Sequence, residues 1–99
     1  MNQHVTLKKW DVVEHLKTPE DLQLYLDACM ETGDVALITA ALGDIARAHG
    51  MTQLARETGL APEALYRSLS GQGNPEFSTI LKVVDALGLR LQIVPRQAA

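Results

Sequence analysis

Apolar residues recur at three- and four-residue intervals along most of the chain, a pattern typical of amphipathic helices. The first such segment runs from Pro19 to about Glu31. Thr18 is placed to cap it, because Pro19 suits the first helical position and the acidic residues that follow favour the first turn. The predicted apolar face of this helix is Leu22, Tyr25, Leu26, Cys29 and Met30.

A second helix is predicted between two glycine-containing breaks. Thr32-Gly33-Asp34 interrupts the first periodic segment and offers Asp34 as the next N-cap, and the new segment ends at His49-Gly50. Its predicted apolar stripe is Val35, Ile38, Leu42, Ile45 and Ala46. Asp44 and Arg47 lie three residues apart and can pair on the surface of this helix.

From Gly50 onward the predicted elements become shorter. Residues 51–58 can form two helical turns that Gly59 ends, and residues 62–69 form a second short helix. Two glycines and an Asn-Pro pair predict a loop over residues 70–75. Helical spacing returns over residues 77–87, and Gly88 is a natural C-cap. The predicted core stripe of this last helix is Phe77, Ile80, Leu81, Val84 and Leu87.

The two ends of the chain have a different pattern. Apolar and polar residues alternate over residues 89–94, which predicts a short, half-buried C-terminal strand that Pro95 ends. A lone strand needs a neighbour, and two remain open: the N-terminal residues 5–8 or a second subunit. A short helix is predicted over residues 10–16, with Trp10 as an anchor for the N-terminal segment.

Composition places the chain among small soluble domains. Its 99 residues are 46% hydrophobic and 21% charged, enough for one compact unit with a single core. No stretch approaches the ~20 apolar residues of a membrane span, and no secretory signal is recognisable. One cysteine and three scattered histidines indicate neither a disulfide nor a metal site. We therefore expect a cytoplasmic protein that needs no metal or other cofactor and does not engage a membrane.

Charge is distributed unevenly along the chain. Residues 1–45 contain three lysines and eight acidic residues, a net charge of −5, whereas residues 46–99 have a net charge of +2. The first part could attract a basic partner, and the second could approach a phosphate backbone. The total of −3 is ordinary for a small domain, so this asymmetry is only an indication.

Residues 51–69 have the spacing of a helix-turn-helix. Two short helices that pack at a steep angle need a small residue where they touch, and Ala55 supplies it. Gly59 provides the backbone freedom for the chain to reverse within a few residues. The residues expected to anchor both helices to the core are Leu54, Leu60, Leu65 and Leu69.

With these residues in place, the chain resembles the HigA-like antitoxins, often described as addiction-module antidote proteins, within the lambda-repressor-like superfamily. The blocks that carry the resemblance are GMTQLARETGL over 50–60, LYR over 65–67, GNPEF over 73–77, LKV over 81–83, and upstream WD over 10–11, TPED over 18–21 and ALGDIAR over 41–47. Together they extend over nearly the whole chain, roughly Trp10 to Leu91.

The resemblance implies a mainly α fold, a five-helix lambda-repressor-like helix-turn-helix domain with an N-terminal helical extension and a short C-terminal strand. Residues 1–33 would be the extension and first helix, and residues 34–99 the DNA-binding domain, in one compact unit. It further implies a repressor of its own operon that binds double-stranded operator DNA and neutralises a small, RelE/HigB-like ribonuclease toxin.

For the DNA contacts, the resemblance implies that the second helix of the motif enters the major groove. Arg67 is the best candidate to read guanine, because a guanidinium can pair with two groove acceptors at once. Glu63 could accept from cytosine, and Tyr66 could bind a phosphate or pack on a thymine methyl group. Residues of the preceding helix and of the loop would hold phosphates. The complete set is Thr52, Gln53, Arg56, Ala61, Pro62, Glu63, Tyr66, Arg67 and Gln72.

The sequence also departs from the family pattern. Ala61 and Pro62 stand where similar motifs often carry a hydroxyl and another polar residue, so few polar groups remain to read bases. We expect a homodimer, because two half-sites would offset the weak binding of an acidic monomer.

Other classes of function are weighed against this one. An enzyme is not expected, since no phosphate-binding glycine loop, nucleophile elbow or metal cluster is present. Two alternatives stay open: a regulator without a toxin, and an interaction module whose helix-turn-helix has lost DNA binding. A small basic protein encoded next to this one would favour the antitoxin, and a gel shift with upstream DNA would separate the interaction module.

Overall fold

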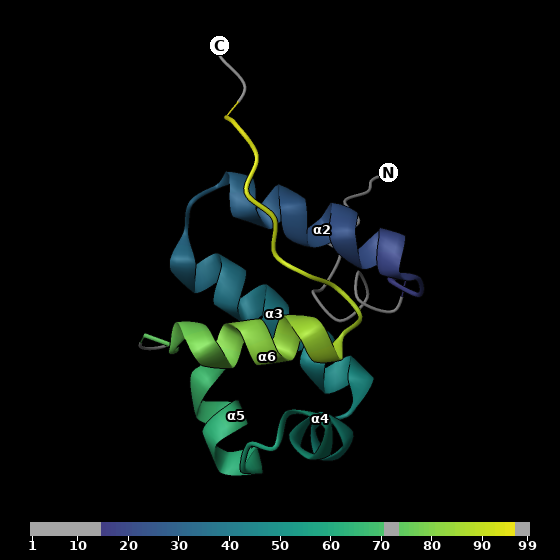
Figure 1. Cartoon of the computed structure of the whole chain (residues 1–99), viewed down its shortest axis with the longest axis vertical. Coiled ribbons are helices and arrows are strands. Elements are labelled where there is room, and N and C mark those ends of the chain that lie inside the picture. The colour runs from purple at the N-terminus through teal and green to yellow at the C-terminus, as the bar shows by residue number, and fades with distance from the viewer. Residues whose placement is uncertain (1–14, 71–73, 97–99) are drawn as a thin grey trace, which may run out of the picture.

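The computed structural model of the chain describes residues 15–70 and 74–96, and this part forms five helices (Figure 1). They are α2 (Pro19–Glu31), α3 (Val35–His49), α4 (Met51–Thr58), α5 (Pro62–Ser68) and α6 (Phe77–Ala86). Each begins and ends within one residue of the boundaries that the sequence predicts. The mainly helical class is therefore confirmed.

Side chains cap the first two helices as predicted. The Thr18 hydroxyl accepts a hydrogen bond from the Asp21 N–H at 3.1 Å, and the Asp21 carboxylate accepts from the Thr18 N–H at 3.3 Å. This reciprocal pair is a capping box, which satisfies two donors at the start of α2. Asp34 caps α3 by accepting a hydrogen bond from the Ala36 N–H at 3.1 Å.

A left-handed glycine ends α6. Gly88 has a φ of 82°, its N–H donates to the Asp85 carbonyl at 3.0 Å, and the Leu89 N–H donates to the Val84 carbonyl at 3.1 Å. These two bonds form a Schellman motif, in which glycine is favoured because other side chains rarely adopt this φ. The turn directs the chain from α6 back across the molecule.

The core lies where α3, α4, α5 and α6 meet, and α2 packs against α3. The largest fully buried side chains are Leu54, Leu65, Leu69 and Val83. Cys29 is buried, as expected, and burial raises the pKa of its thiol. In Figure 1, α2 lies toward one end of the long axis of the molecule, and α4 and α5 lie at the other.

The structure corrects the predicted burial of four apolar residues. Met30 and Val35 are 49% and 58% exposed, and they stand near the end of α2 and at the start of α3. Phe77 and Leu81 are 67% and 41% exposed. Ile80, Val84 and Leu87 of the predicted stripe do face the core, and Thr79 and Val83 are buried beside them. The buried side is therefore rotated from the predicted stripe toward Thr79 and Val83, which leaves Phe77 and Leu81 exposed.

The predicted C-terminal strand is also corrected. Residues 89–94 have no regular secondary structure, and no strand occurs in residues 15–70 or 74–96. The alternation is nonetheless real in part, since Leu89 and Leu91 pack against the core. A strand forms only with a hydrogen-bonding neighbour, and the described residues supply none.

Other predictions fall on the remaining residues. The candidate partner strand over residues 5–8, Trp10 and most of the helix expected over residues 10–16 lie outside the described part of the chain. Of that helix, only His15 and Leu16 are described, and neither is helical.

Candidate nucleic-acid interface

α4 and α5 are joined by a turn over residues 59–61, and one threonine holds this turn in place. α4 ends at Gly59, whose φ of 75° reverses the chain. The Thr58 hydroxyl donates to the Leu54 carbonyl at 2.8 Å and accepts a hydrogen bond from the Leu60 N–H at 3.3 Å. Thr58 therefore fixes the end of α4 and the path into α5.

Apolar anchors fix the inner sides of both helices. Leu54 of α4, Leu65 of α5 and Leu69 at the end of α5 are fully buried, and Leu60 packs against the same core. Ala55 is 9% exposed, as expected of a small residue at a helix contact. These anchors leave the opposite sides of α4 and α5 facing outward.

Eight of the nine residues predicted to contact DNA are described, and all eight are exposed. Glu63, Tyr66 and Arg67 follow three- and four-residue spacing, so they share the side of α5 that faces away from Leu65. From α4 and the turn come Thr52, Gln53, Arg56, Ala61 and, at the first position of α5, Pro62. Gln72 lies outside the described residues. The structure thus gathers eight predicted contacts on two adjoining helices and their turn.

The N-terminus of α5 lacks a side-chain cap. Ala61 is the N-cap residue, and no side-chain hydrogen bond reaches the first N–H groups. Pro62 occupies the first position and has no N–H of its own, so one donor fewer needs a partner. The sequence has no hydroxyl at position 61, and the start of α5 accordingly has no side-chain cap.

One residue at this surface was not predicted. Glu57 of α4 accepts a hydrogen bond from the Gln53 amide nitrogen at 3.0 Å, and the His49 ring nitrogen lies 3.1 Å from its other oxygen. These hydrogen bonds, first from Gln53 and then from His49, lower the pKa of Glu57 below its ordinary value. A charged carboxylate therefore stands beside a predicted phosphate contact. The four-residue spacing from Gln53 to Glu57 is the one sequence signal that points to this pair.

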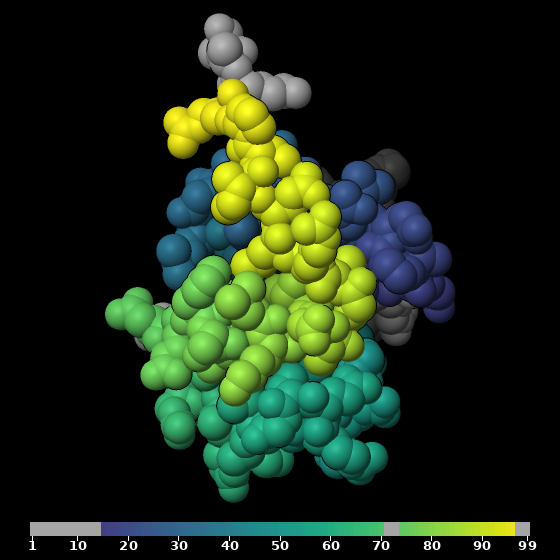
Figure 2. Space-filling model, viewed as in Figure 1, coloured from purple at the N-terminus to yellow at the C-terminus, as the bar shows by residue number. Residues whose placement is uncertain are grey.

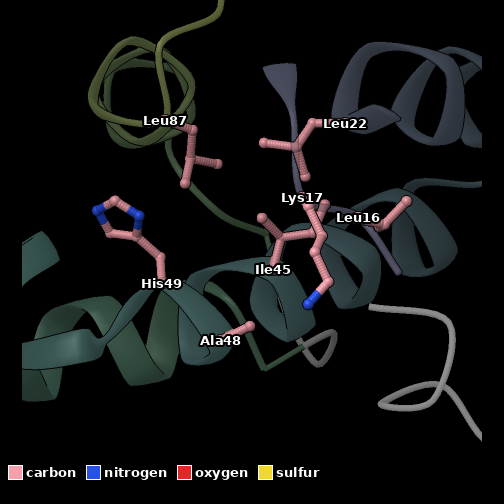
Figure 3. A pocket seen from close by; sticks show the side chains of 7 residues that line it. All are labelled: Leu16, Lys17, Leu22, Ile45, Ala48, His49 and Leu87. Atoms are coloured by element: carbon pink, nitrogen blue, oxygen red, sulfur yellow. The ribbon is translucent and has the colours of Figure 1, made fainter. Parts of the chain in front are cut away.

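A hollow of about 200 Å³ opens between α2, α3 and the end of α6 (Figure 3). It is lined by Leu16, Lys17, Leu22, Ile45, Ala48, His49 and Leu87. Five of the seven lining residues are apolar, Lys17 and His49 are the other two, and none of the eight described DNA-contact candidates takes part. The hollow and the α4–α5 surface are therefore separate features of the molecule.

Residues 15–70 and 74–96 contain no group of three or more His, Cys, Asp or Glu side chains arranged to hold a metal ion. None of the five helices combines the length and the apolar character that crossing a bilayer requires.

Comparison with known proteins places the chain in a family. The family described as "Probable addiction module antidote protein" matches residues 6–95. The chain belongs to this family. A protein of Haemophilus influenzae, described as uncharacterized, is 51% identical over 87 residues, which cover 88% of this chain and 90% of the relative. No solved structure matches the chain.

Membership of the antidote family confirms the antitoxin part of the resemblance. It indicates an antidote role in an addiction module, and an antidote implies a toxin partner in general. The HigA-like type and the lambda-repressor-like superfamily remain predictions. So do the roles of the candidate DNA contacts.

Proposed function

We propose that this antidote-family protein is the DNA-binding antitoxin of a type II toxin–antitoxin module. It represses its own operon by sequence-specific binding and neutralises a RelE/HigB-like ribonuclease toxin. The observation that supports DNA binding is the α4–α5 pair, whose inner sides carry buried leucines while its outer sides carry the exposed candidate contacts. Family membership supports the antitoxin role.

In this proposal α4 and α5 are a DNA-binding helix-turn-helix of the lambda-repressor-like kind. α5 enters the major groove, where the Arg67 guanidinium pairs with the two acceptors of guanine. Glu63 accepts from the cytosine amino group, and Tyr66 contacts a phosphate or a thymine methyl group. Thr52, Gln53, Arg56 and Gln72 hold phosphates and fix the register of the protein on the duplex.

The placement of negative charge is compatible with this proposal. α2 contains four acidic residues and no basic one, and Figure 1 places it at the end of the molecule away from α4 and α5. Its carboxylates therefore lie far from the phosphates that α5 would approach. The same acidic helix suits a basic toxin by complementary charge, so one chain could bind DNA and toxin on different sides.

The overall charge of −3 favours a dimer, in which two copies of α5 contact the DNA. A monomer with few basic groups releases few counterions and binds DNA weakly. A homodimer places two α5 helices on half-sites about 34–36 Å apart, which adds the contacts of both copies. The proposal is thus a cytoplasmic homodimer that acts by binding, without enzymatic activity or cofactor.

An electrophoretic shift with the DNA upstream of the operon, at stated salt, tests the proposal. We expect a retarded band with that fragment, a much weaker one with a shuffled fragment of equal length, and a further shift when the neighbouring gene product is added. Co-expression is expected to relieve growth arrest by that gene product. Equal affinity for both fragments would refute the repressor, and unrelieved growth arrest would refute the antitoxin.

One observation favours a second candidate, an interaction module with a degenerate helix-turn-helix. The start of α5 presents Ala61 and Pro62, which offer no polar group to a base and no cap to the helix. Such a protein would still neutralise the toxin but would bind neither DNA fragment. A regulator without a toxin would bind the upstream fragment specifically but would not relieve the growth arrest.

A further inference from the structure

α6 presents two large apolar side chains to solvent. Phe77 and Leu81 are both exposed and stand four residues apart, so they are neighbours on one side of the helix. Among the large exposed apolar residues of the five described helices, no other two are separated by one helical turn. Single exposed apolar residues are ordinary, whereas an adjacent pair on one helix indicates an interaction surface.

The side of α6 that carries this pair faces outward. Thr79 and Val83 are buried on the opposite side of the helix and hold it against the core. Figure 2 shows α6, in green, at the surface of the molecule between the teal α4–α5 end and the yellow C-terminal segment. The outer side of α6 is therefore open to a partner.

Charges of opposite sign flank the apolar pair. Glu76 precedes Phe77 at the N-cap position of α6, and Lys82 follows Leu81. Both charged side chains are exposed, and neither has an ion-pair partner in residues 15–70 or 74–96. Glu76 makes no capping hydrogen bond either. The surface thus has an apolar centre with a free negative charge at one end and a free positive charge at the other.

We propose that this side of α6 packs antiparallel on the same side of α6 in a second copy of the chain. When two identical helices cross about a two-fold axis at the level of residue 79, residues equally far from that level on either side face each other. Phe77 and Leu81 are each two residues away, so Phe77 of one copy packs on Leu81 of the other. Glu76 and Lys82 are each three residues away, so two identical ion pairs flank the apolar contact.

The order of the charges favours a second copy over the other partners of the proposed function. A basic toxin surface would be attracted by Glu76 but repelled by Lys82, and DNA would be attracted by Lys82 but repelled by Glu76. A partner that satisfies both must carry the two signs in reverse order around an apolar centre. An antiparallel copy of α6 has this arrangement by symmetry. Asp85, the remaining charged residue of α6, lies one turn beyond Leu81 and away from the crossing.

The interface agrees with the proposed function, on which this inference rests for its purpose. A repressor that reads two half-sites must be a dimer. The eight described candidates for DNA contact belong to α4, α5 and the turn between them, and none belongs to α6. Pairing through α6 therefore supplies the dimer without using a proposed DNA contact.

Charge reversal tests the interface and its register in the full chain. Glu76→Lys and Lys82→Glu each place two like-charged pairs in the homodimer, so we expect sedimentation equilibrium at low salt to show dissociation constants about tenfold above that of the wild type. An equimolar mixture of the two variants restores both opposite-charge pairs and is expected to associate about as tightly as the wild type. A monomeric wild type, unchanged dissociation in both variants, or a mixture as weak as either variant alone overturns the proposal.

Two variants outside α6 provide the matched control. Glu31→Lys and Arg96→Glu make the same charge changes on exposed residues of α2 and of the C-terminal segment. We expect each to keep the wild-type dissociation constant within about twofold, because isolated exposed charges contribute little, and their mixture to gain nothing. Losses as large as those of the α6 variants would mean that net charge controls association, which also overturns the proposal.

Alanine variants test the apolar centre separately. We expect Leu81→Ala to weaken dimerisation about tenfold, because Leu81 is covered by Phe77 of the other copy. Leu24→Ala, which truncates an exposed leucine of α2, is expected to leave dimerisation unchanged. Leu81 is buried only in the dimer, so the circular dichroism of Leu81→Ala is expected to keep the helical signal of the wild type. Equal dissociation constants for Leu81→Ala and the wild type overturn the proposal.

The two proposals can fail separately in these experiments. A chain that dimerises through α6 but binds upstream and shuffled DNA equally would keep the interface and lose the repressor. A chain that binds upstream DNA specifically, yet dimerises independently of Glu76, Leu81 and Lys82, would keep the repressor and lose the interface.

Discussion

Gly43 of α3 lies directly against the backbone carbonyl of Leu69, the residue that ends α5. A Cβ atom added to Gly43 would collide with that carbonyl oxygen. Because glycine has no side chain, α3 can approach the end of α5 more closely than any other residue would allow. Gly43 therefore helps to set the position of the helix that we propose to read DNA.

Gly43→Ala tests this contact through the sign of its effect. Glycine inside a helix normally costs about 1 kcal/mol relative to alanine, so helix propensity alone predicts that the variant is more stable. The collision with Leu69 predicts the reverse, a loss of about 1–3 kcal/mol, as in other overpacked sites. Urea denaturation measures the difference. A stabilised variant would show that the two backbones are not in contact.

Thr18→Ala removes one half of the capping box at the start of α2. The Asp21 N–H then loses its partner, and we expect the free energy of unfolding to fall by about 1 kcal/mol. Thr18→Ser keeps the hydroxyl and is the matched control. Equal losses in the two variants would mean that the threonine methyl group, and not the cap, supplies the stability.

The buried side of α6 can be tested with a pair of alanine variants. Val83 is fully buried and Leu81 is 41% exposed. Although Leu81→Ala removes more carbon, we expect Val83→Ala to cost more, about 1–3 kcal/mol against less than about 1 kcal/mol. Thermal unfolding of both variants gives the comparison. A larger loss for Leu81→Ala would mean that Leu81 belongs to the buried side of α6, as the sequence predicts.

The hydrogen bonds to Glu57 predict its titration. A carboxyl group whose pKa is lower in the folded than in the unfolded state stabilises the fold above its unfolded pKa, and this contribution disappears as the pH falls through the folded pKa. We expect an NMR titration to give Glu57 a pKa below its ordinary value, and Gln53→Ala to move it upward. If Gln53→Ala left the pKa of Glu57 unchanged, the hydrogen bond between Gln53 and Glu57 would not form in solution.

Local signals in the sequence were sufficient to place the helices. Thr18, Asp34, Gly59 and Gly88 each act within a few residues, so caps and chain reversals could be read without tertiary information. The buried leucines of the α4–α5 pair were predicted on the same basis. Membership of an antidote family was also predictable, because its blocks extend along most of the chain.

Features that depend on tertiary contacts could not be read in this way. Phe77 and Leu81 have the right spacing for a core stripe, but the packing partners of α6 select the side that begins at Thr79. The strand predicted over residues 89–94 does not form, because a strand needs a hydrogen-bonding neighbour and the described residues supply none. Gln53 is a predicted phosphate contact, and its side chain also donates a hydrogen bond to Glu57. Helical spacing allows this pairing but does not require it.

The measurement that tests the central claim most directly is fluorescence anisotropy of upstream and shuffled duplexes with Arg67→Ala, at one stated salt concentration. Arg96→Ala, which removes the same charge from the C-terminal segment, is the control. We predict that Arg67→Ala loses about 1–3 kcal/mol of binding to the upstream duplex and narrows the preference over the shuffled one, while Arg96→Ala keeps that preference. An Arg67→Ala variant with the full preference of the wild type would contradict the proposal that α5 reads DNA.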